Sequence, residues 1–238
     1  MVRLGLKQLK NNGMINTLVG LIFPNLCVGC NGVLLAAEQH ICTHCIENFP
    51  ETKFHTLPEN QLEKAFWGRV NIERAYSFLI FRKQGIVQKI LHELKYSNNP
   101  ELGIMLGQIY GSKLREYGIG FDAVVAIPLH EKKQKLRGYN QSDCFAQGIA
   151  QSLQCAHLKN VVVRNKFTDT QTKKGRFDRW LNVGDVFGIE TPDLIQHKKV
   201  LLVDDVITTG ATIEACAHSI LNYTPHLSVA SIACVVNQ

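Results

Sequence analysis

The segment from Val200 to Thr212 constrains the fold of this 238-residue chain more than any other. An uninterrupted apolar run, Val200 to Val203, leads directly into two carboxylates, Asp204 and Asp205, and then into a turn rich in threonine and glycine. A short continuous apolar run that ends in turn residues indicates a strand buried on both faces, as in a parallel sheet covered by helices. The segment therefore predicts a buried strand, a tight polar turn and the start of a helix.

The same alternation of apolar strands and helices extends over most of the chain. Strand composition is found at 75–81, 122–127, 161–163, 200–203 and 227–236. Helical patterns are found at 86–96, 102–117, 140–153 and 210–221, and a basic loop is expected between Ile127 and Asn140. Buried strands that alternate with helices predict a doubly wound α/β sheet.

The turn after the acidic pair has the chemistry of an anion site. The N-terminus of a helix presents unpaired backbone N–H groups and a positive dipole end. Gly210 allows close approach of a ligand to the backbone, and the threonine hydroxyls add donors. No lysine follows Gly210, so a P-loop is not indicated. Carboxylates accept hydrogen bonds from sugar hydroxyls, and a sugar diol beside a phosphate is a ribose 5-phosphate. The alternative is an ordinary strand–turn–helix in which Asp and Thr act as caps.

Four of the eight cysteines are grouped in two C-x-x-C pairs near the N-terminus. The spacing Cys27-x2-Cys30-x11-Cys42-x2-Cys45 is typical of two knuckles that offer four thiolates to one ion, and four thiolates suit tetrahedral zinc. Four protein ligands leave no open position, so the zinc would be structural. Free or disulfide-bonded thiols and an iron–sulfur cluster are the alternatives.

The positive charge of the chain is concentrated in one window. Residues 130–180 contain eleven Lys and Arg against four Asp and Glu, whereas the rest of the chain has fifteen against sixteen. A local excess of this kind indicates a phosphate-bearing partner. Tyr139, Phe167, Phe177 and Trp180 interleave with the charges, so single-stranded nucleic acid could stack on this surface. The alternatives are that the lysines form a solvated face and that the aromatic residues belong to the core.

The N-terminus superficially resembles a signal peptide, because basic residues precede an apolar stretch in residues 1–23. Asparagines interrupt that stretch, and it lacks a small-x-small cleavage pattern. We expect an amphipathic lead-in helix, with Met14 as an alternative start. No window of the chain has eighteen consecutive apolar residues, so a membrane span is not expected. A cytoplasmic protein follows, in which reduced thiols favour metal over disulfides.

We expect three parts along the chain. Residues 1–50 would form the lead-in helix and the four-cysteine zinc module. Residues 51–72 are polar and weakly patterned, which suits a linker or a short, loosely packed helix. Residues 73–238 would form the α/β domain.

The segment 200–212 resembles the phosphoribosyl pyrophosphate (PRPP) motif of type I phosphoribosyltransferases. Further motifs narrow this resemblance to the ComF/GntX competence family, and it then covers about Leu21 to Val236. These motifs are Cys27-Val-Gly-Cys30 after Leu21-Ile-Phe-Pro24, Lys95-Tyr96, Arg137-Gly-Tyr-Asn-Gln141 and the stretch from Thr170-Gln-Thr172 through Arg176, Arg179 and Asn182 to Phe187. One departure is visible, because Ala126-Ile-Pro-Leu129 stands where relatives usually have Pro-Val-Pro-Leu.

The resemblance implies a type I phosphoribosyltransferase-like doubly wound parallel sheet, preceded by a small zinc-binding module. It also implies PRPP bound with Mg²⁺ bridging the diphosphate, and it assigns roles to residues of this chain. Asp204 and Asp205 would hold the ribose hydroxyls, and Lys95 and Arg137 would join them as catalytic residues. The 5-phosphate turn would be Thr208, Thr209, Gly210, Ala211 and Thr212. The loop of Pro128 and Leu129 would meet the diphosphate, and Arg137 to Gln141 would border the site. From their own chemistry, Arg176 and Arg179 are further candidate contacts, since fixed guanidinium forks suit phosphate oxygens.

The resemblance implies a ComF-like role in natural transformation, with binding of incoming single-stranded DNA and of competence proteins at the inner face of the membrane. Two alternatives stay open. The chain could be an active phosphoribosyltransferase of unknown acceptor, since we find no residues typical of a purine, pyrimidine or glutamine-amide site. It could also be a PRPP-sensing regulator without turnover, or a GntX-like nutrient-utilisation protein.

Overall fold

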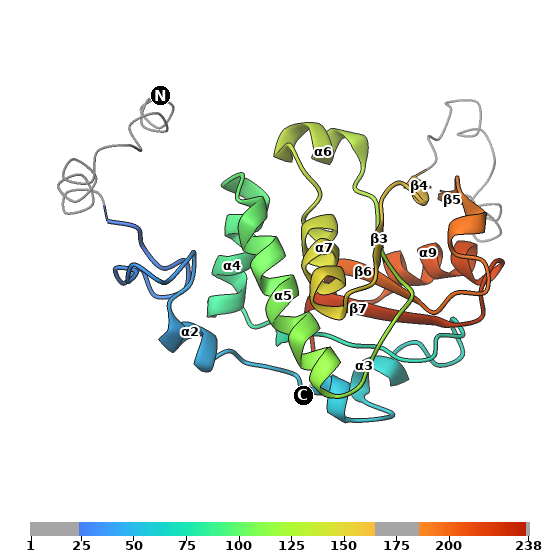
Figure 1. Ribbon diagram of the computed structural model, residues 1–238, viewed down its shortest axis with the longest axis horizontal. Helices are drawn as coiled ribbons and strands as arrows, with labels where there is room; N and C mark the ends of the chain where they lie inside the picture. Colours follow the sequence, from blue (N-terminus) through green and yellow to red (C-terminus); the bar gives the residue numbers. More distant parts are fainter. Residues whose placement is uncertain (1–23, 165–185, 237–238) are drawn as a thin grey trace. The chain divides into compact units, whose positions relative to one another are not determined.

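The computed structural model describes residues 24–164 and 186–236 (Figure 1). The chain divides into two compact units, Met1–Phe49 and Pro50–Gln238. The expected lead-in helix in residues 1–23 lies outside the described residues. Among the described residues, no helix combines the length and the apolar character that a membrane crossing requires.

The described part of the first unit contains one short helix and two isolated bridges. The helix α2 spans Thr43–Glu47, and the bridges pair Leu26 with Val33 and Gln39 with Ile41. Few apolar side chains of residues 24–49 are buried; Ile41 and Phe49 are among them. So small a core indicates that another interaction must stabilise the unit.

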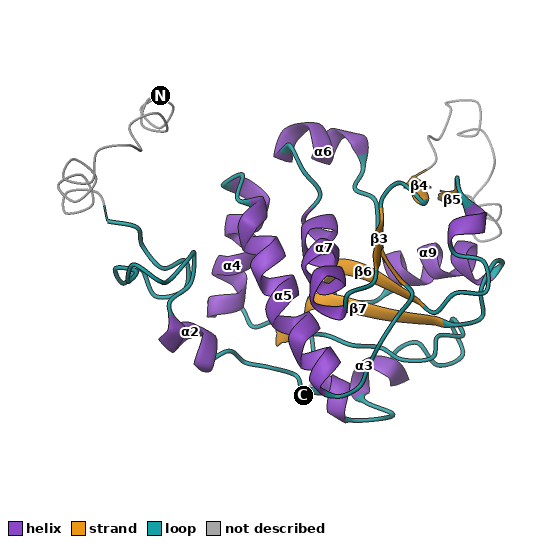
Figure 2. Cartoon of the chain, viewed as in Figure 1, coloured by secondary structure: helices purple, strands orange, loops and turns teal. Residues whose placement is uncertain are grey.

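The second unit is built on a five-stranded parallel sheet, which confirms the predicted fold class (Figure 2). The strand order is β1-β7-β6-β2-β3. The strands span Leu79–Ile80 (β1), Ala123–Ala126 (β2), Ala156–Leu158 (β3), Val200–Ile207 (β6) and Leu227–Cys234 (β7). Strand β6 is central: β2 pairs with it on one edge and β7 on the other.

Four helices of this unit agree closely with the predicted ranges: Ile86–Tyr96 (α4), Pro100–Glu116 (α5), Gln141–Leu153 (α7) and Ala211–Leu221 (α9). Two shorter helices, Gln61–Lys64 (α3) and Glu131–Arg137 (α6), lie outside those ranges. Helix α7 packs against β2 and β6, and α9 packs against β6 and β7.

Helices α5 and α7 approach each other unusually closely, because both lack side chains at the crossing. A Cβ atom at Gly107 would lie 2.2 Å from the carbonyl oxygen of Phe145, and one at Gly148 would lie 2.1 Å from that of Ile104. Both separations are far below van der Waals contact. The two glycines therefore allow the backbones to meet, and this fixes the position of α7 against α5.

Three sequence predictions differ from the structure. The basic loop expected before Asn140 contains a helix, α6, whose first turn is capped by the side chain of His130. No residue of α6 is buried, so it leaves no apolar stripe in the sequence. The expected strand 161–163 is β4 (Val162–Arg164), which leaves the main sheet and pairs antiparallel with β5 (Phe187–Ile189). The expected strand 75–81 is reduced to β1 and an isolated bridge at Ala75.

Residues 51–72, expected as a linker, pack as part of the second unit. They contain a 3₁₀ turn, Phe54–Thr56, and α3, which begins with a capping box between Asn60 and Glu63. Phe54, Leu62 and Phe66 are buried in the same core cluster as the central strand. Leu62 and Phe66 are four positions apart, so they lie on the same side of the helical turn. The sequence analysis allowed a linker or a short helix for this polar segment, and the structure contains the short helix.

Candidate functional site

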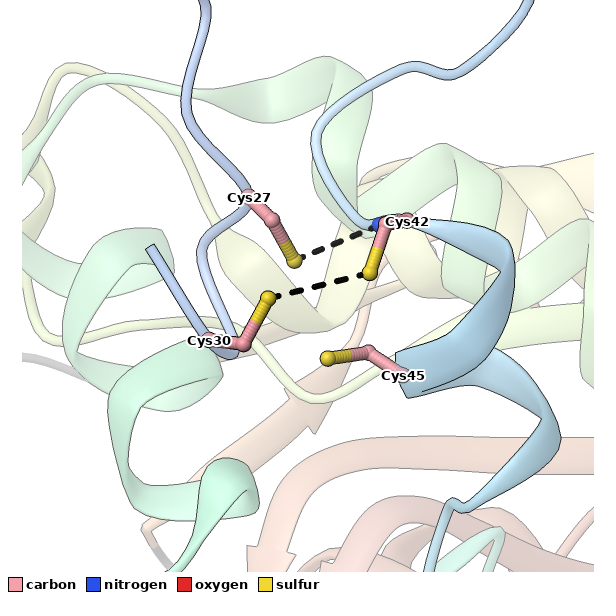
Figure 3. A group of neighbouring side chains, drawn as sticks. All are labelled: Cys27, Cys30, Cys42 and Cys45. Atoms are coloured by element: carbon pink, nitrogen blue, oxygen red, sulfur yellow. Dashed lines mark hydrogen bonds between the residues drawn. The ribbon is translucent and has the colours of Figure 1, made fainter. Parts of the chain in front are cut away.

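The four cysteines of the first unit converge on one point (Figure 3). Their sulfur atoms all lie within 4.8 Å of one another, and those of Cys30 and Cys42 are 3.8 Å apart. Zn–S bonds of about 2.3 Å in a tetrahedron require sulfurs roughly 3.8 Å apart. All four are free thiols, so the cluster is not a disulfide pair. The donor set and its spacing therefore fit a tetrahedral metal ion, and the cluster could bind zinc.

The backbone around the cluster favours at least one thiolate. Burial opposes ionisation of Cys27, but the N–H groups of Cys42, Cys30 and Gly29 outweigh it and lower its pKa to about 6. One of these bonds, from the Cys42 N–H to the Cys27 sulfur, measures 3.3 Å. Donated N–H groups of this kind also stabilise metal-bound sulfur.

The acidic pair lies on the last part of β6, at the carboxyl end of the sheet. The Ser142 hydroxyl donates to Asp204 at 3.2 Å, and the N–H of Asp205 donates to the same Asp204 oxygen at 2.8 Å. Burial and, next, the charge of Asp205 raise the pKa of Asp204 to about 6, although these bonds and Lys95 act in the opposite direction. The site thus holds two adjacent carboxylates with few partners for their charge.

Lys95 and Arg137 come from two other helices to the same region. The Lys95 ammonium, near the end of α4, lies 3.1 Å from an Asp205 oxygen. The Arg137 guanidinium donates to the Gln141 side chain at 2.8 Å, and Gln141 in turn donates to the carbonyl of Leu94, next to Lys95. The structure therefore links all four predicted catalytic residues through one chain of contacts.

The predicted 5-phosphate turn is exposed, and its N-cap residue has no side chain. Gly210 is the N-cap of α9 at φ +77°, a conformation that favours glycine. The Ala211 N–H, the first of the helix, donates a long hydrogen bond of 3.4 Å to the Thr209 hydroxyl oxygen. Thr208, Thr209, Ala211 and Thr212 are exposed. A small hollow is lined by Asp204 and the turn from Val206 to Ile213. Acid, hydroxyl and helix-terminal N–H groups thus surround one concave surface.

The predicted diphosphate loop lies beside the acidic pair because β2 is next to β6. The register pairs Ala126 with Val203, and the Ile127 N–H donates to the Val203 carbonyl at 2.9 Å. Pro128 and Leu129 follow, both half-buried. Ligands of open α/β sheets bind at such carboxyl ends. Two further predicted contacts, Arg176 and Arg179, lie outside the described residues.

Ser142 escaped the sequence prediction, whereas Arg137 to Gln141 were expected to border the site. Ser142 binds Asp204, and Tyr139 donates a hydrogen bond to the Leu94 carbonyl that Gln141 also uses. Asn140 caps α7 and donates to the Ile127 carbonyl at 2.9 Å, so it ties the helix to the end of β2. The Arg-Gly-Tyr-Asn-Gln segment was itself a signal, but its internal bonding was not visible in the sequence.

Comparisons with known proteins show which proteins this chain is similar to. The model of the "Phosphoribosyl transferase domain" family matches residues 141–238. "DNA utilization protein YhgH" of Escherichia coli K12 is 27% identical over 219 residues, which cover 84% of this chain and 92% of that protein. "Competence protein F" of Haemophilus influenzae is 28% identical over 79% of this chain and 86% of that protein. "Competence protein ComFC" of Bacillus subtilis is 21% identical over 88% and 83%.

Among solved structures, one match is the glutamine PRPP amidotransferase from B. subtilis complexed with ADP and GMP. It is 16% identical with a TM-score of 0.43, and the match covers 59% of this chain but only 30% of that one.

The raised pKa of Asp204 implies a cost in stability that can be measured. Relative to the unfolded chain, the folded state resists ionisation of Asp204, so stability falls as the pH rises from about 4 through about 6. We expect Asp204→Asn, which keeps the oxygen that accepts from Ser142, to raise the free energy of unfolding at pH 7.5 by about 1–3 kcal/mol. The gain should decline as the pH is lowered toward 4. Urea unfolding followed by tryptophan fluorescence measures both.

The matched control is Asp193→Asn, since Asp193 is exposed and should affect stability little at either pH. A loss of stability in Asp204→Asn at pH 7.5, or a gain that does not depend on pH, would contradict the buried-charge interpretation.

Proposed function

The chain belongs to the ComF family of competence proteins, and from this premise we propose that it acts in natural transformation through a PRPP-binding site of the phosphoribosyltransferase type. The observation that carries the proposal is the convergence of Lys95, Asp204, Asp205 and the exposed turn 208–212 at one end of the sheet. The names of the relatives, which refer to competence and to DNA utilization, support the biological role.

The chemistry of each group suggests its place on PRPP. Asp204 and Asp205 accept hydrogen bonds from the ribose 2′ and 3′ hydroxyls, and the N–H groups of turn 208–212 bind the 5-phosphate. Lys95 and Arg137 face the diphosphate, where fixed positive charge stabilises the negative oxygens of the leaving group. Mg²⁺ would neutralise part of the diphosphate charge. Pro128 and Leu129 bring the backbone of the neighbouring loop to the same group.

In this proposal Lys95 interacts with two groups, Asp205 and the diphosphate of PRPP. Without ligand it pairs with Asp205 at 3.1 Å, which offsets part of the repulsion between the two carboxylates. When a ribose diol occupies the carboxylates, the ammonium is free to turn to the diphosphate. Transfer of the phosphoribosyl group would need a nucleophile at C1 and would release pyrophosphate, so binding and turnover can be measured separately.

Calorimetric titration with PRPP and Mg²⁺ tests the pocket. We expect the double variant Asp204→Ala/Asp205→Ala to bind PRPP about ten- to a hundred-fold more weakly, because it cannot form the charged hydrogen bonds to the ribose. Asp193→Ala, which removes an exposed carboxylate elsewhere, should bind normally. Absence of heat with the unmutated protein would overturn the proposal. Pyrophosphate release with candidate acceptors then separates an enzyme from a PRPP sensor.

Single-stranded DNA is proposed as a second ligand on the surface of α6. This helix is exposed along nearly its whole length and presents Lys132, Lys133 and Lys135, together with Leu136, which is 81% exposed. A basic surface with an apolar residue suits a flexible strand whose bases are unstacked. Because α6 follows the diphosphate loop directly, DNA binding and PRPP binding would involve adjoining parts of the chain.

Salt-dependent binding of a single-stranded oligonucleotide tests this surface. We expect Lys132→Gln/Lys135→Gln to weaken binding and to reduce the magnitude of the slope of log K against log salt by about 1.4, because each of the two lysines contributes about 0.7 when it binds a phosphate of a single strand. The control Lys53→Gln/Lys64→Gln removes two exposed lysines of the 51–72 segment and should leave the slope unchanged. An equal salt dependence of both double variants would contradict the proposal that DNA binds to α6.

We propose that the four-cysteine cluster holds structural zinc. Because the first unit buries few apolar side chains, zinc binding of roughly 10–16 kcal/mol would supply its stability. Action in the cytoplasm follows, since the thiols must stay reduced.

Metal analysis tests this assignment. We expect one zinc per chain, and we expect Cys45→Ser to lose it because three thiolates no longer complete the tetrahedron. The control Cys155→Ser removes a half-buried thiol of the second unit and should keep full zinc content. Iron with visible absorption in place of zinc would contradict the proposal.

A further inference from the structure

Arg69, which lies in the segment expected as a linker, reaches the backbone of the proposed 5-phosphate turn. Its guanidinium donates to the Thr209 carbonyl at 2.8 Å and to its own chain at Ala65 at 3.0 Å. Two further donors, on Nε and Nη2, go to the Glu214 carboxylate, and the Nε bond measures 3.1 Å. One side chain therefore joins residues 65–69 to both the turn and the first turns of α9.

The ring of Phe66 adds a steric contact at the same place. Phe66 is fully buried, and a Cβ atom at Gly210 would lie only 2.7 Å from its ring. The guanidinium carbon of Arg69 lies 5.9 Å from the centre of that ring. The Gly210 backbone thus lies against the Phe66 ring on one side. The carbonyl of the Thr209–Gly210 peptide accepts a hydrogen bond from Arg69.

These contacts determine where the N–H groups of the turn point. In a trans peptide the carbonyl and the N–H of the same plane point in opposite directions. Because Arg69 binds the Thr209 carbonyl, the N–H of Gly210 is directed away from Arg69. An anion site made of backbone donors depends on such fixed orientations, since a disordered turn would have to be ordered on binding.

Glu214 completes the arrangement from within α9. Its N–H donates to the Gly210 carbonyl at 2.9 Å, while its carboxylate receives two Arg69 donors. The Arg69 charge is therefore paired with Glu214, and its side chain is held in one geometry. This pairing distinguishes Arg69 from an arginine that binds a ligand directly, because its donors are already used by the protein.

We propose that Arg69 is a positioning residue, which holds turn 208–212 in the conformation that binds the 5-phosphate and is itself held by Glu214 and Phe66. The inference rests on the proposed PRPP site and names a part of the chain, residues 65–69, that this site requires. It affects the phosphate end of the ligand and leaves the diphosphate end unchanged.

Titrations with ribose 5-phosphate and with pyrophosphate measure binding at the 5-phosphate end and at the diphosphate end separately. We expect Arg69→Met to bind ribose 5-phosphate about tenfold more weakly than the unmutated protein, while its affinity for pyrophosphate with Mg²⁺ changes less than twofold. Arg69→Lys should bind ribose 5-phosphate with intermediate affinity, because one ammonium cannot serve Thr209 and Glu214 in the fork geometry of a guanidinium.

Arg74→Met is the matched control. Arg74 is close to Arg69 in sequence and is also paired, with Glu63 at 2.6 Å and the Leu57 carbonyl at 3.1 Å, but these bonds do not involve the turn. We expect Arg74→Met to change neither affinity. Equal affinity of Arg69→Met and the unmutated protein for ribose 5-phosphate, or an equal loss for both ligands, would overturn the inference.

Amide hydrogen exchange of the ligand-free protein provides an independent measurement. We expect residues 208–212 to exchange several-fold faster in Arg69→Met than in Arg74→Met, and unchanged exchange there would overturn the positioning role. If the unmutated protein binds neither ligand, the proposed function fails, and the exchange rates still decide whether Arg69 holds the turn.

Discussion

The pairing of β6 on both edges by parallel strands is the constraint on which the rest of the second unit depends. Val200 to Val203 are fully buried between β2 and β7, so polar groups can appear only where the strand reaches the end of the sheet. Asp204 and Asp205 stand at that point. Because β2 pairs in parallel with β6, the loop after β2 lies beside the acidic pair. The pairing of these two strands therefore brings together the two loops that a sugar phosphate would contact.

This position makes the acidic pair electrostatically costly, and the surrounding helices reduce that cost. Lys95 from α4 pairs with Asp205, and Ser142 from α7 donates to Asp204. Helix α7 is held in the position that places Ser142 beside Asp204, because its backbone packs directly against α5 where Gly148 of α7 meets Gly107 of α5. The close packing of α5 and α7 thus positions the serine that hydrogen-bonds to the charged Asp204. A buried carboxyl such as Asp204, whose pKa is raised to about 6, is typical of functional sites.

Much of the fold followed from patterns that are local in sequence. Ile86–Tyr96 and Gln141–Leu153 bury one face each, and their ranges were predicted closely because apolar spacing and capping residues lie within the element. Helix α6 was missed because it buries nothing, and β3 because its three residues are mostly exposed or half-buried. The strand at 161–163 was predicted, but its partner in β5 depends on chain far along the sequence.

The sequence by itself determined the chemistry of the protein: four thiolates at zinc-knuckle spacing, two carboxylates after a buried strand, and a glycine turn at the start of a helix. These signals are readable because each lies within about twenty residues. Only the tertiary structure decided which groups meet. Lys95 reaches Asp205 across 110 positions, and Arg69 reaches Thr209 across 140. Such pairs leave no local pattern, because they are set by the packing of helices and segments against the sheet.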